Sequence, residues 1–281
     1  MRKQLVTYST LMVHLELGRP NAGLLQIAGD LAQRFQAGVI GIVACQPMLL
    51  VYSDGTYVSG DVFEQDRAQD EAATKAAEAE FRTAFHGRSG FMEWRSTVTY
   101  APLSDYLARE ARSVNLFITG VTSSALLSAA PPVSTGDLIM QLGRPALIVP
   151  SSANAFHFER MIVAWRDTRE AARAAFDALP LLQKATHVSV VGIAAEQDLP
   201  ATRDQLKDVA GWLKRHGVTA ECHAEPSTGD DAVRLSAIAQ DLGADVVVAG
   251  AYGHNRVREW ALGGVTRDLL LRADRCPLLS H

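Results

Sequence analysis

Cysteine is scarce in this chain of 281 residues, which contains only Cys45, Cys222 and Cys276. Three scattered cysteines form neither a disulfide framework nor a C-x-x-C metal or redox pattern. We expect all three to be small buried side chains, as free cysteine usually is in proteins. The sequence therefore gives no sign of a disulfide-stapled or zinc-stabilised fold.

A strong net charge and long apolar runs are also lacking. The formal net charge is −4, which gives no general attraction to nucleic acid or to an anionic membrane. No apolar run approaches the roughly 20 residues of a membrane helix, and polar residues interrupt the stretch after Met1–Gln4, which makes it a poor signal peptide. With 48% hydrophobic and 21% charged residues, the composition is that of an ordinary globular protein, and we expect it in the cytoplasm.

Familiar catalytic motifs are missing as well. The chain has no Ser-His-Asp order, no H-E-x-x-H and no Walker loop with G-K-[ST]. We expect His14 and His223 to be structural rather than ligands. Nothing in the sequence supplies a strong general base, so fast ATP hydrolysis is not supported.

What the chain does contain is one pattern of strands and helices, written twice. Apolar runs predict strands at 7–15, 39–44, 92–100, 115–119 and 146–149, then again at 161–165, 188–193, 218–224, 246–249 and 277–280. Helical periodicity predicts a helix that follows the turn at 18–21 and runs to about 37, and helices at 64–85, 102–112 and 137–142, then at 168–182, 200–216, 230–242 and 265–273. We therefore predict an α/β fold of two domains, 1–152 and 153–281, with parallel sheets covered on both faces.

Matching positions in the two halves support the repeat. Gly120 corresponds to Gly250, since each follows a buried strand, and Arg144–Leu147 corresponds to Cys276–Leu279. The first half carries extra residues, mostly in the irregular segment 46–60 and in a longer second helix. This segment could cover a cavity or contact a partner, although a surface loop is the simpler interpretation. Doubly wound sheets bind ligands at the carboxyl ends of their strands, where the strand order reverses.

The most informative motif follows the strand 246–249. Gly250, Gly253 and Gly263 have the spacing G-x2-G-x9-G, and a helix is expected behind them. Glycines let the backbone approach an anion closely, and free N–H groups at a helix start point toward it. The same glycines could also be ordinary tight turns.

This loop resembles the nucleotide loop of the universal stress protein family, G-x2-G-x9-G followed by Ser or Thr. The resemblance covers nearly the whole chain as a tandem pair. It implies two Rossmann-like, adenine nucleotide alpha-hydrolase-like sheets with strand order 3-2-1-4-5. It also implies an internal pseudo-dimer in which the fifth strands, 146–149 and 278–280, meet antiparallel. A further homodimer is plausible because exposed sheet edges are usually covered.

The resemblance also implies a site for ATP, ADP or AMP in the second half, with or without magnesium. The adenine would lie against the backbone of Val190 and Val191, and the ribose would meet Asp167. The phosphates would lie against a set formed by the glycine loop and its neighbours: Gly250, Gly253, His254, Arg256, Gly263, Gly264, Val265 and Thr266.

Two positions depart from the family pattern. Gly264 stands where the family has a hydroxyl residue, and the nearest hydroxyl is Thr266. Arg166 stands at the acidic position after the first strand, and Asp167 follows it. Either Asp167 takes the ribose or Arg166 changes the preferred phosphate pattern, unless the two simply form a solvated turn.

The first half retains less of the motif. Gly120 and the acidic Glu16 are present, but Ser123 stands where a second glycine would, and Pro131 and Pro132 remove N–H donors. We expect this half to bind nucleotide weakly or not at all.

Three functions remain open at this stage. The first is a stress-response regulator that binds an adenine nucleotide and changes its contacts with a protein partner. The second is a paired-domain scaffold without a nucleotide. The third is a slow ATPase or phosphotransferase, for which the fold alone is a weak argument.

Overall fold

The computed structural model describes residues 7–47, 60–121, 133, 135–151, 157–251, 265, 269 and 275–281. Every statement below about the structure refers to these residues. The irregular segment predicted at 46–60 and the helix predicted at 265–273 therefore lie mostly outside the described residues.

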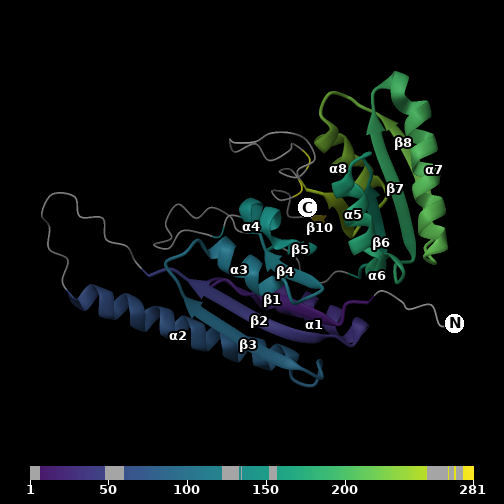
Figure 1. Cartoon of the computed structure of the whole chain (residues 1–281). Helices are drawn as coiled ribbons and strands as arrows, with labels where there is room; N and C mark the ends of the chain where they lie inside the picture. The colour runs from purple at the N-terminus through teal and green to yellow at the C-terminus, as the bar shows by residue number, and fades with distance from the viewer. Residues whose placement is uncertain are drawn as a thin grey trace, which may run out of the picture.

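All ten described strands form one continuous sheet (Figure 1). The first half contributes β1 (Thr10–His14), β2 (Gly38–Cys45), β3 (Met92–Val98), β4 (Leu116–Gly120) and β5 (Ala146–Val149). The second half contributes β6 (Arg160–Ala164), β7 (His187–Ala194), β8 (Glu221–Pro226), β9 (Val246–Gly250) and β10 (Cys276–Ser280).

The strand order is β3-β2-β1-β4-β5-β10-β9-β6-β7-β8, which confirms the order 3-2-1-4-5 predicted for each half. Strands within a half pair in parallel, and β5 and β10 pair antiparallel, with Leu147 opposite Leu278 and Ala146 opposite Leu279. The predicted antiparallel meeting of the fifth strands is therefore confirmed. The boundary predicted at 152/153 falls outside the described residues and stays a prediction.

Helices cover both faces of the sheet, as the burial of its strands requires. The first half has α1 (Ala22–Phe35), α2 (Gly60–Phe85), α3 (Leu103–Ala111) and α4 (Thr135–Leu142), and the second has α5 (Arg169–Asp177), α6 (Leu179–Leu182), α7 (Leu199–Arg215) and α8 (Asp231–Asp241). One apolar cluster holds α1, α2, α5, α6 and α7 against the sheet, and a second holds α3, α4 and α8 on the other face. Both clusters contain residues of both halves, so the two halves share their core.

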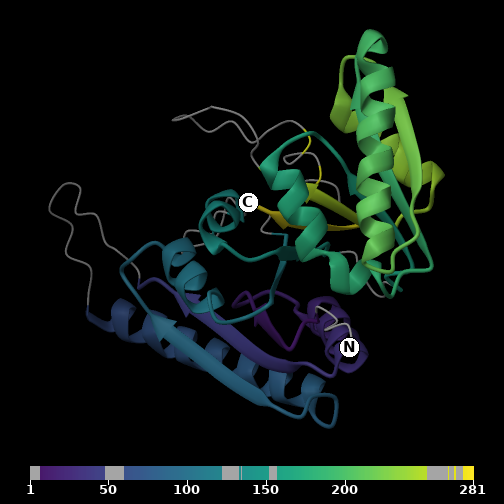
Figure 2. The ribbon, with the colours of Figure 1, turned by 45° about the vertical axis from the view of Figure 1, so that its right-hand side comes forward.

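Side chains on the first of these faces also join the two halves, which Figure 2 shows side by side. The Tyr8 hydroxyl donates a hydrogen bond of 2.7 Å to the carbonyl oxygen of Asp177. The Phe35 ring lies edge-on to Tyr8, and Lys184 Nζ lies 5.4 Å from the centre of the Phe35 ring. These contacts add to the β5–β10 pairing and make the pair of halves one unit.

Three local features differ from the sequence predictions. The single helix predicted at 168–182 is two helices, because Pro180 has no N–H with which to continue the hydrogen-bond ladder of α5. The strand predicted at 218–224 begins only at Glu221. Cys222 is exposed on that edge strand, so the prediction that all three cysteines are buried is wrong for Cys222 and confirmed for Cys45 and Cys276.

Two predicted helix boundaries are confirmed. Thr168 caps α5, since its hydroxyl accepts a hydrogen bond of 3.2 Å from the N–H of Ala171. Gly217 follows α7 with φ of +84°, the left-handed conformation that ends many helices.

Candidate functional site

Each half has a switch point where the strand order reverses about its central strand. In the first half this point lies between β1 and β4, and in the second it lies between β6 and β9. In doubly wound sheets the connections on the two sides of such a point run to opposite faces, and ligands bind at the carboxyl edge there. The predicted site residues Asp167 and Gly250 both lie at this edge of the second half, after β6 and at the end of β9.

The strand pair at the second switch point ends in small side chains. Its last cross-strand pair is Ala164 opposite Ala249, followed on β9 by Gly250. Only two methyl groups therefore stand at the end of this strand pair among the described residues.

Gly250 has a packing role. A Cβ atom at this position would lie 2.5 Å from the carbonyl carbon of Glu170 and 2.6 Å from the nitrogen of Ala171. These are backbone atoms of the first turn of α5, which cannot move aside cheaply. Gly250 thus lets α5 pack onto the end of β9, whether or not its backbone also approaches a ligand.

Side chains of the first turn of α5 supply partners for the groups at the start of this helix. Besides the Thr168 cap, the buried carboxylate of Glu170 lies 2.5 Å from Arg169 Nε, and this hydrogen bond holds the pKa of Glu170 below its usual value. A carboxylate here also complements the positive end of the helix dipole. The first turn of α5 therefore already has a side-chain acceptor and a negative charge of its own.

Arg166 and Asp167 are both exposed in the short turn between β6 and α5. The carbonyl oxygen of Arg166 accepts a hydrogen bond of 2.7 Å from the N–H of Thr168, which shapes the turn. The structure thus presents both side chains at the switch point.

Val190 and Val191 lie in the middle of β7 and are 0% and 1% exposed. The carbonyl oxygen of Val191 accepts a hydrogen bond of 2.8 Å from the N–H of Trp165, and both valines pair with β8. The pairing of β6 with β7 ends at Ala164 opposite Val191, whereas β7 continues to Ala194. Ile193 and Ala194, which are half-buried, therefore form the accessible end of β7. The sequence did not single them out, although the length of the apolar run could have.

Most of the residues predicted to bind the phosphates fall in the part of the chain that the structure does not describe. Gly253, His254, Arg256, Gly263, Gly264 and Thr266 lie outside the described residues. Val265 is helical and half-buried, and it packs against the apolar cluster that contains Ala249.

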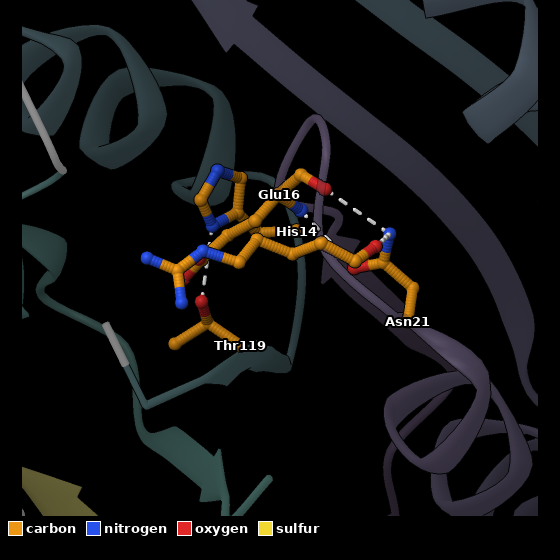
Figure 3. A network of polar contacts seen from close by, with 5 residues as sticks. His14, Glu16, Asn21 and Thr119 are labelled. Carbon is orange, nitrogen blue, oxygen red and sulfur yellow. Dashed lines mark hydrogen bonds and ion pairs between the residues drawn. The ribbon is translucent and has the colours of Figure 1, made fainter. Parts of the chain in front are cut away.

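The first switch point is occupied by polar side chains (Figure 3). His14 and Thr119 form its last cross-strand pair, and His14 Nδ1 lies 3.0 Å from Thr119 Oγ1 in a hydrogen bond. Both residues are buried, and burial lowers the pKa of His14 to about 4, so the ring is neutral at physiological pH.

The turn after β1 is closed by a second set of contacts. The N–H of Glu16 donates to Asn21 Oδ1, and Asn21 Nδ2 donates back to the carbonyl oxygens of Glu16 and Arg19, each at 3.1 Å. Arg19 Nε lies 3.8 Å from Glu16 Oε2. Glu16 does occupy the turn where the sequence predicted an acidic residue, but an internal cation already lies beside its carboxylate.

Two further features, a metal site and a membrane-spanning helix, are absent from the described residues. Among the described residues, no cluster of three or more histidine, cysteine or acidic side chains could hold a metal ion. Within the same part of the chain, no helix has the length and apolar character to cross a bilayer.

No protein-family model and no curated protein sequence matches this chain. Solved structures do match it. A universal stress protein from Archaeoglobus fulgidus DSM 4304 is 14% identical, with a TM-score of 0.74 over 98% of this chain and 99% of that one. A functionally unknown protein from Pseudomonas aeruginosa PAO1 is 15% identical, with a TM-score of 0.60 over 97% of this chain and 92% of that one.

Shorter proteins match one half of the chain. A universal stress protein solved in complex with cAMP is 21% identical and covers 52% of this chain and all of its own length (100%), with a TM-score of 0.35. The two full-length matches cover both halves of the chain, and at 14% and 15% identity they show its fold. From strand order, the β5–β10 junction and these matches, the chain has the fold of a tandem universal stress protein, in which two halves form an internal pseudo-dimer.

Proposed function

We propose that the chain is a regulatory protein that binds an adenine nucleotide in its second half, at the carboxyl edge between β6 and β9. The observation that carries the proposal is the Ala164–Ala249 pair, whose two methyl groups stand where the first half has a histidine and a threonine. The glycine-spaced segment starts at the end of β9, so its backbone N–H groups begin at the same edge. Sites of this kind bind phosphates through the backbone and a helix start.

The parts of the nucleotide can be assigned to parts of the edge. The base lies against the backbone at the carboxyl end of β7. Val190 and Val191 form the buried part of this strand, and Ile193 and Ala194 form its accessible end. Asp167 holds the ribose.

The phosphates take the backbone of Gly250, Gly253, Gly263, Gly264 and Val265, with His254, Arg256 and Thr266 as polar partners. Arg166 at the turn adds a positive charge that favours a nucleotide with more phosphates.

Titration calorimetry of the full chain tests the proposal with ATP, ADP, AMP and cAMP, each with and without magnesium. We expect saturable binding of at least one nucleotide at millimolar concentration or below. Gly253→Val should abolish this binding because a β-branched side chain fills the space that a phosphate needs. Ser123→Val, at the corresponding position of the first half, is the matched control and should bind as the parent does. Absence of binding by the folded parent contradicts the proposal.

The second candidate is a scaffold of the same fold that has lost the nucleotide. Gly264 in place of a hydroxyl residue and Arg166 in place of an acid favour it. Absorbance and mass measurements on freshly purified protein separate the two candidates. A retained adenine nucleotide rules out the scaffold, whereas a nucleotide-free protein that also fails the titration supports it.

A further inference from the structure

A pocket of about 780 Å³ lies in the first half, away from both switch points. One wall is α2, which continues past the ends of β2 and β3 (Figure 1). The facing wall is formed by the carboxyl ends of those strands, at Cys45, Thr97 and Val98, and Tyr100 stands beside it. No residue of β1 or β4 lines it among those described. The pocket is therefore separate from the closed switch point between those strands.

The α2 wall carries an excess of negative charge. Its charged side chains in the pocket are Asp66, Arg67, Asp70, Glu71, Lys75 and Glu78. Arg67 Nε lies 3.1 Å from Glu71 Oε1, and Arg82 Nη2 lies 2.6 Å from Glu78 Oε1, so each of these pairs is neutral. Asp66, Asp70 and Lys75 remain, which leaves one negative charge in excess at this wall. Asp66 and Asp70 stand one helical turn apart, and within the described residues no ion pair joins either of them to a cation. Like charges at this spacing repel each other.

Burial and nearby negative charge act together on Asp70 and Cys45, which line the same pocket. Burial and the charge of Asp66 raise the pKa of Asp70. Burial and the charges of Asp70 and Asp66 raise the pKa of Cys45 to about 11. Additional negative charge is therefore disfavoured here, and a cation would be stabilised.

The outer part of the pocket is apolar and aromatic. Val98 and Tyr100 line it and are 63% and 76% exposed. An aromatic ring beside carboxylates suits an organic cation, because the ring face attracts positive charge and its surface packs against carbon. A metal ion fits less well, since the described residues offer no cluster of three ligating side chains.

We propose that the α2 pocket binds a small organic ammonium ion, whose charged group lies against Asp66 and Asp70 and whose carbon skeleton lies on Val98 and Tyr100. The pocket volume accommodates a ligand of this class. The proposal concerns a different half of the molecule from the nucleotide site and does not depend on it.

Titration of the full chain with phenethylammonium chloride tests the proposal by calorimetry and by the NMR shifts of the Cys45 and Thr97 amides. We expect saturable binding with shifts at both amides. Phenylethanol, which has the same body without the charge, should give no saturable shift. Magnesium chloride should also leave these amides unchanged.

Variants locate the charged contact. Asp70→Asn should weaken phenethylammonium binding about tenfold or more, because a charge-assisted contact is lost. Glu80→Gln, an exposed position on α2 that does not line the pocket, removes the same charge and should bind as the parent does. Equal binding by Asp70→Asn, equal binding of phenylethanol, or a response to magnesium alone at these amides would each overturn the proposal. Thermal unfolding of each variant confirms that it is folded.

Discussion

The two switch points occupy equivalent places in the two halves and differ in what stands there. The first ends in His14 opposite Thr119, hydrogen-bonded and buried, and the second ends in Ala164 opposite Ala249. The strand register around each pair is the same, so the two pairs occupy equivalent positions and carry different side chains. One switch point therefore ends in a polar contact, and the other ends in two methyl groups.

The turns that follow the central strands differ too. Residues 15–21 connect β1 to α1, whereas only 165–168 connect β6 to α5. The shorter turn brings the start of α5 onto the end of β9, where only glycine fits at position 250. In the first half, a Cβ atom at Gly120 would have no neighbour within 4 Å. Two glycines that match in sequence thus have different packing requirements.

Replacing the Ala164–Ala249 pair by the His–Thr pair of the first half should have the largest effect, and the effect is on nucleotide affinity. The double variant Ala164→His with Ala249→Thr places the contents of the first switch point in the second. We expect nucleotide binding to fall by about a hundredfold or more, since a site that loses its free volume loses several kcal/mol. Calorimetry with the nucleotide that binds the parent gives the answer. A folded double variant with unchanged affinity would show that the nucleotide lies elsewhere.

The buried histidine should make the first half sensitive to acid. The pKa of His14 is lowered to about 4 in the folded state against about 6.5 unfolded, so the unfolded state binds a proton more tightly. The free energy of unfolding is therefore undiminished by His14 above pH 6.5. It falls by up to about 3 kcal/mol as the pH drops toward 4.

Urea unfolding between pH 4 and pH 7 measures this loss. His14→Gln should unfold with a flatter pH profile, because glutamine keeps an amide for Thr119 without a titrating ring. A profile as steep as that of the parent would assign the acid sensitivity to other groups.

The matched glycines should respond differently to a methyl group. Gly250→Ala places a Cβ against the α5 backbone and should lower the free energy of unfolding by about 1–3 kcal/mol. Gly120→Ala has open space and should change it by less than about 0.5 kcal/mol. Urea denaturation of both variants compares them, and equal losses would contradict the packing role of Gly250.

The smallest expected effect concerns the helix starts. Thr168→Ala removes the side-chain cap of α5 and should cost about 1 kcal/mol. Asn21 precedes α1 without capping it, because its side-chain oxygen accepts a hydrogen bond from the N–H of Glu16 instead. Thr168→Ser, which keeps the hydroxyl, is the control and should retain most of the stability in thermal unfolding.

Much of the fold was predictable because parallel strands covered on both faces appear in the sequence as short apolar runs. Val246–Gly250 and Ala146–Val149 are examples, and both were located within a residue. The edge strand β8 was misplaced at its start, since a half-exposed strand such as Glu221–Pro226 has no apolar run to mark it. The break after α5 was missed although Pro180 marks it.

The candidate site was predictable only in outline. The glycine spacing indicated an edge and a ligand class, but the backbone of Val190 and Val191 proved to lie inside the sheet, and the accessible end of β7 is at Ile193 and Ala194. The α2 pocket had no signal at all, because its two walls are separated in the chain and meet only when the helix packs beside the strands.

The sequence by itself determined the repeated αβ pattern, since strands and helices are marked by the periodicity of near neighbours in the chain. The strand order followed from the resemblance. The tertiary structure alone decided which residues stand opposite each other at the two switch points, why Gly250 differs from Gly120 and where α2 leaves a pocket. Those features depend on register and on the closeness of distant segments, and local periodicity carries no information about either.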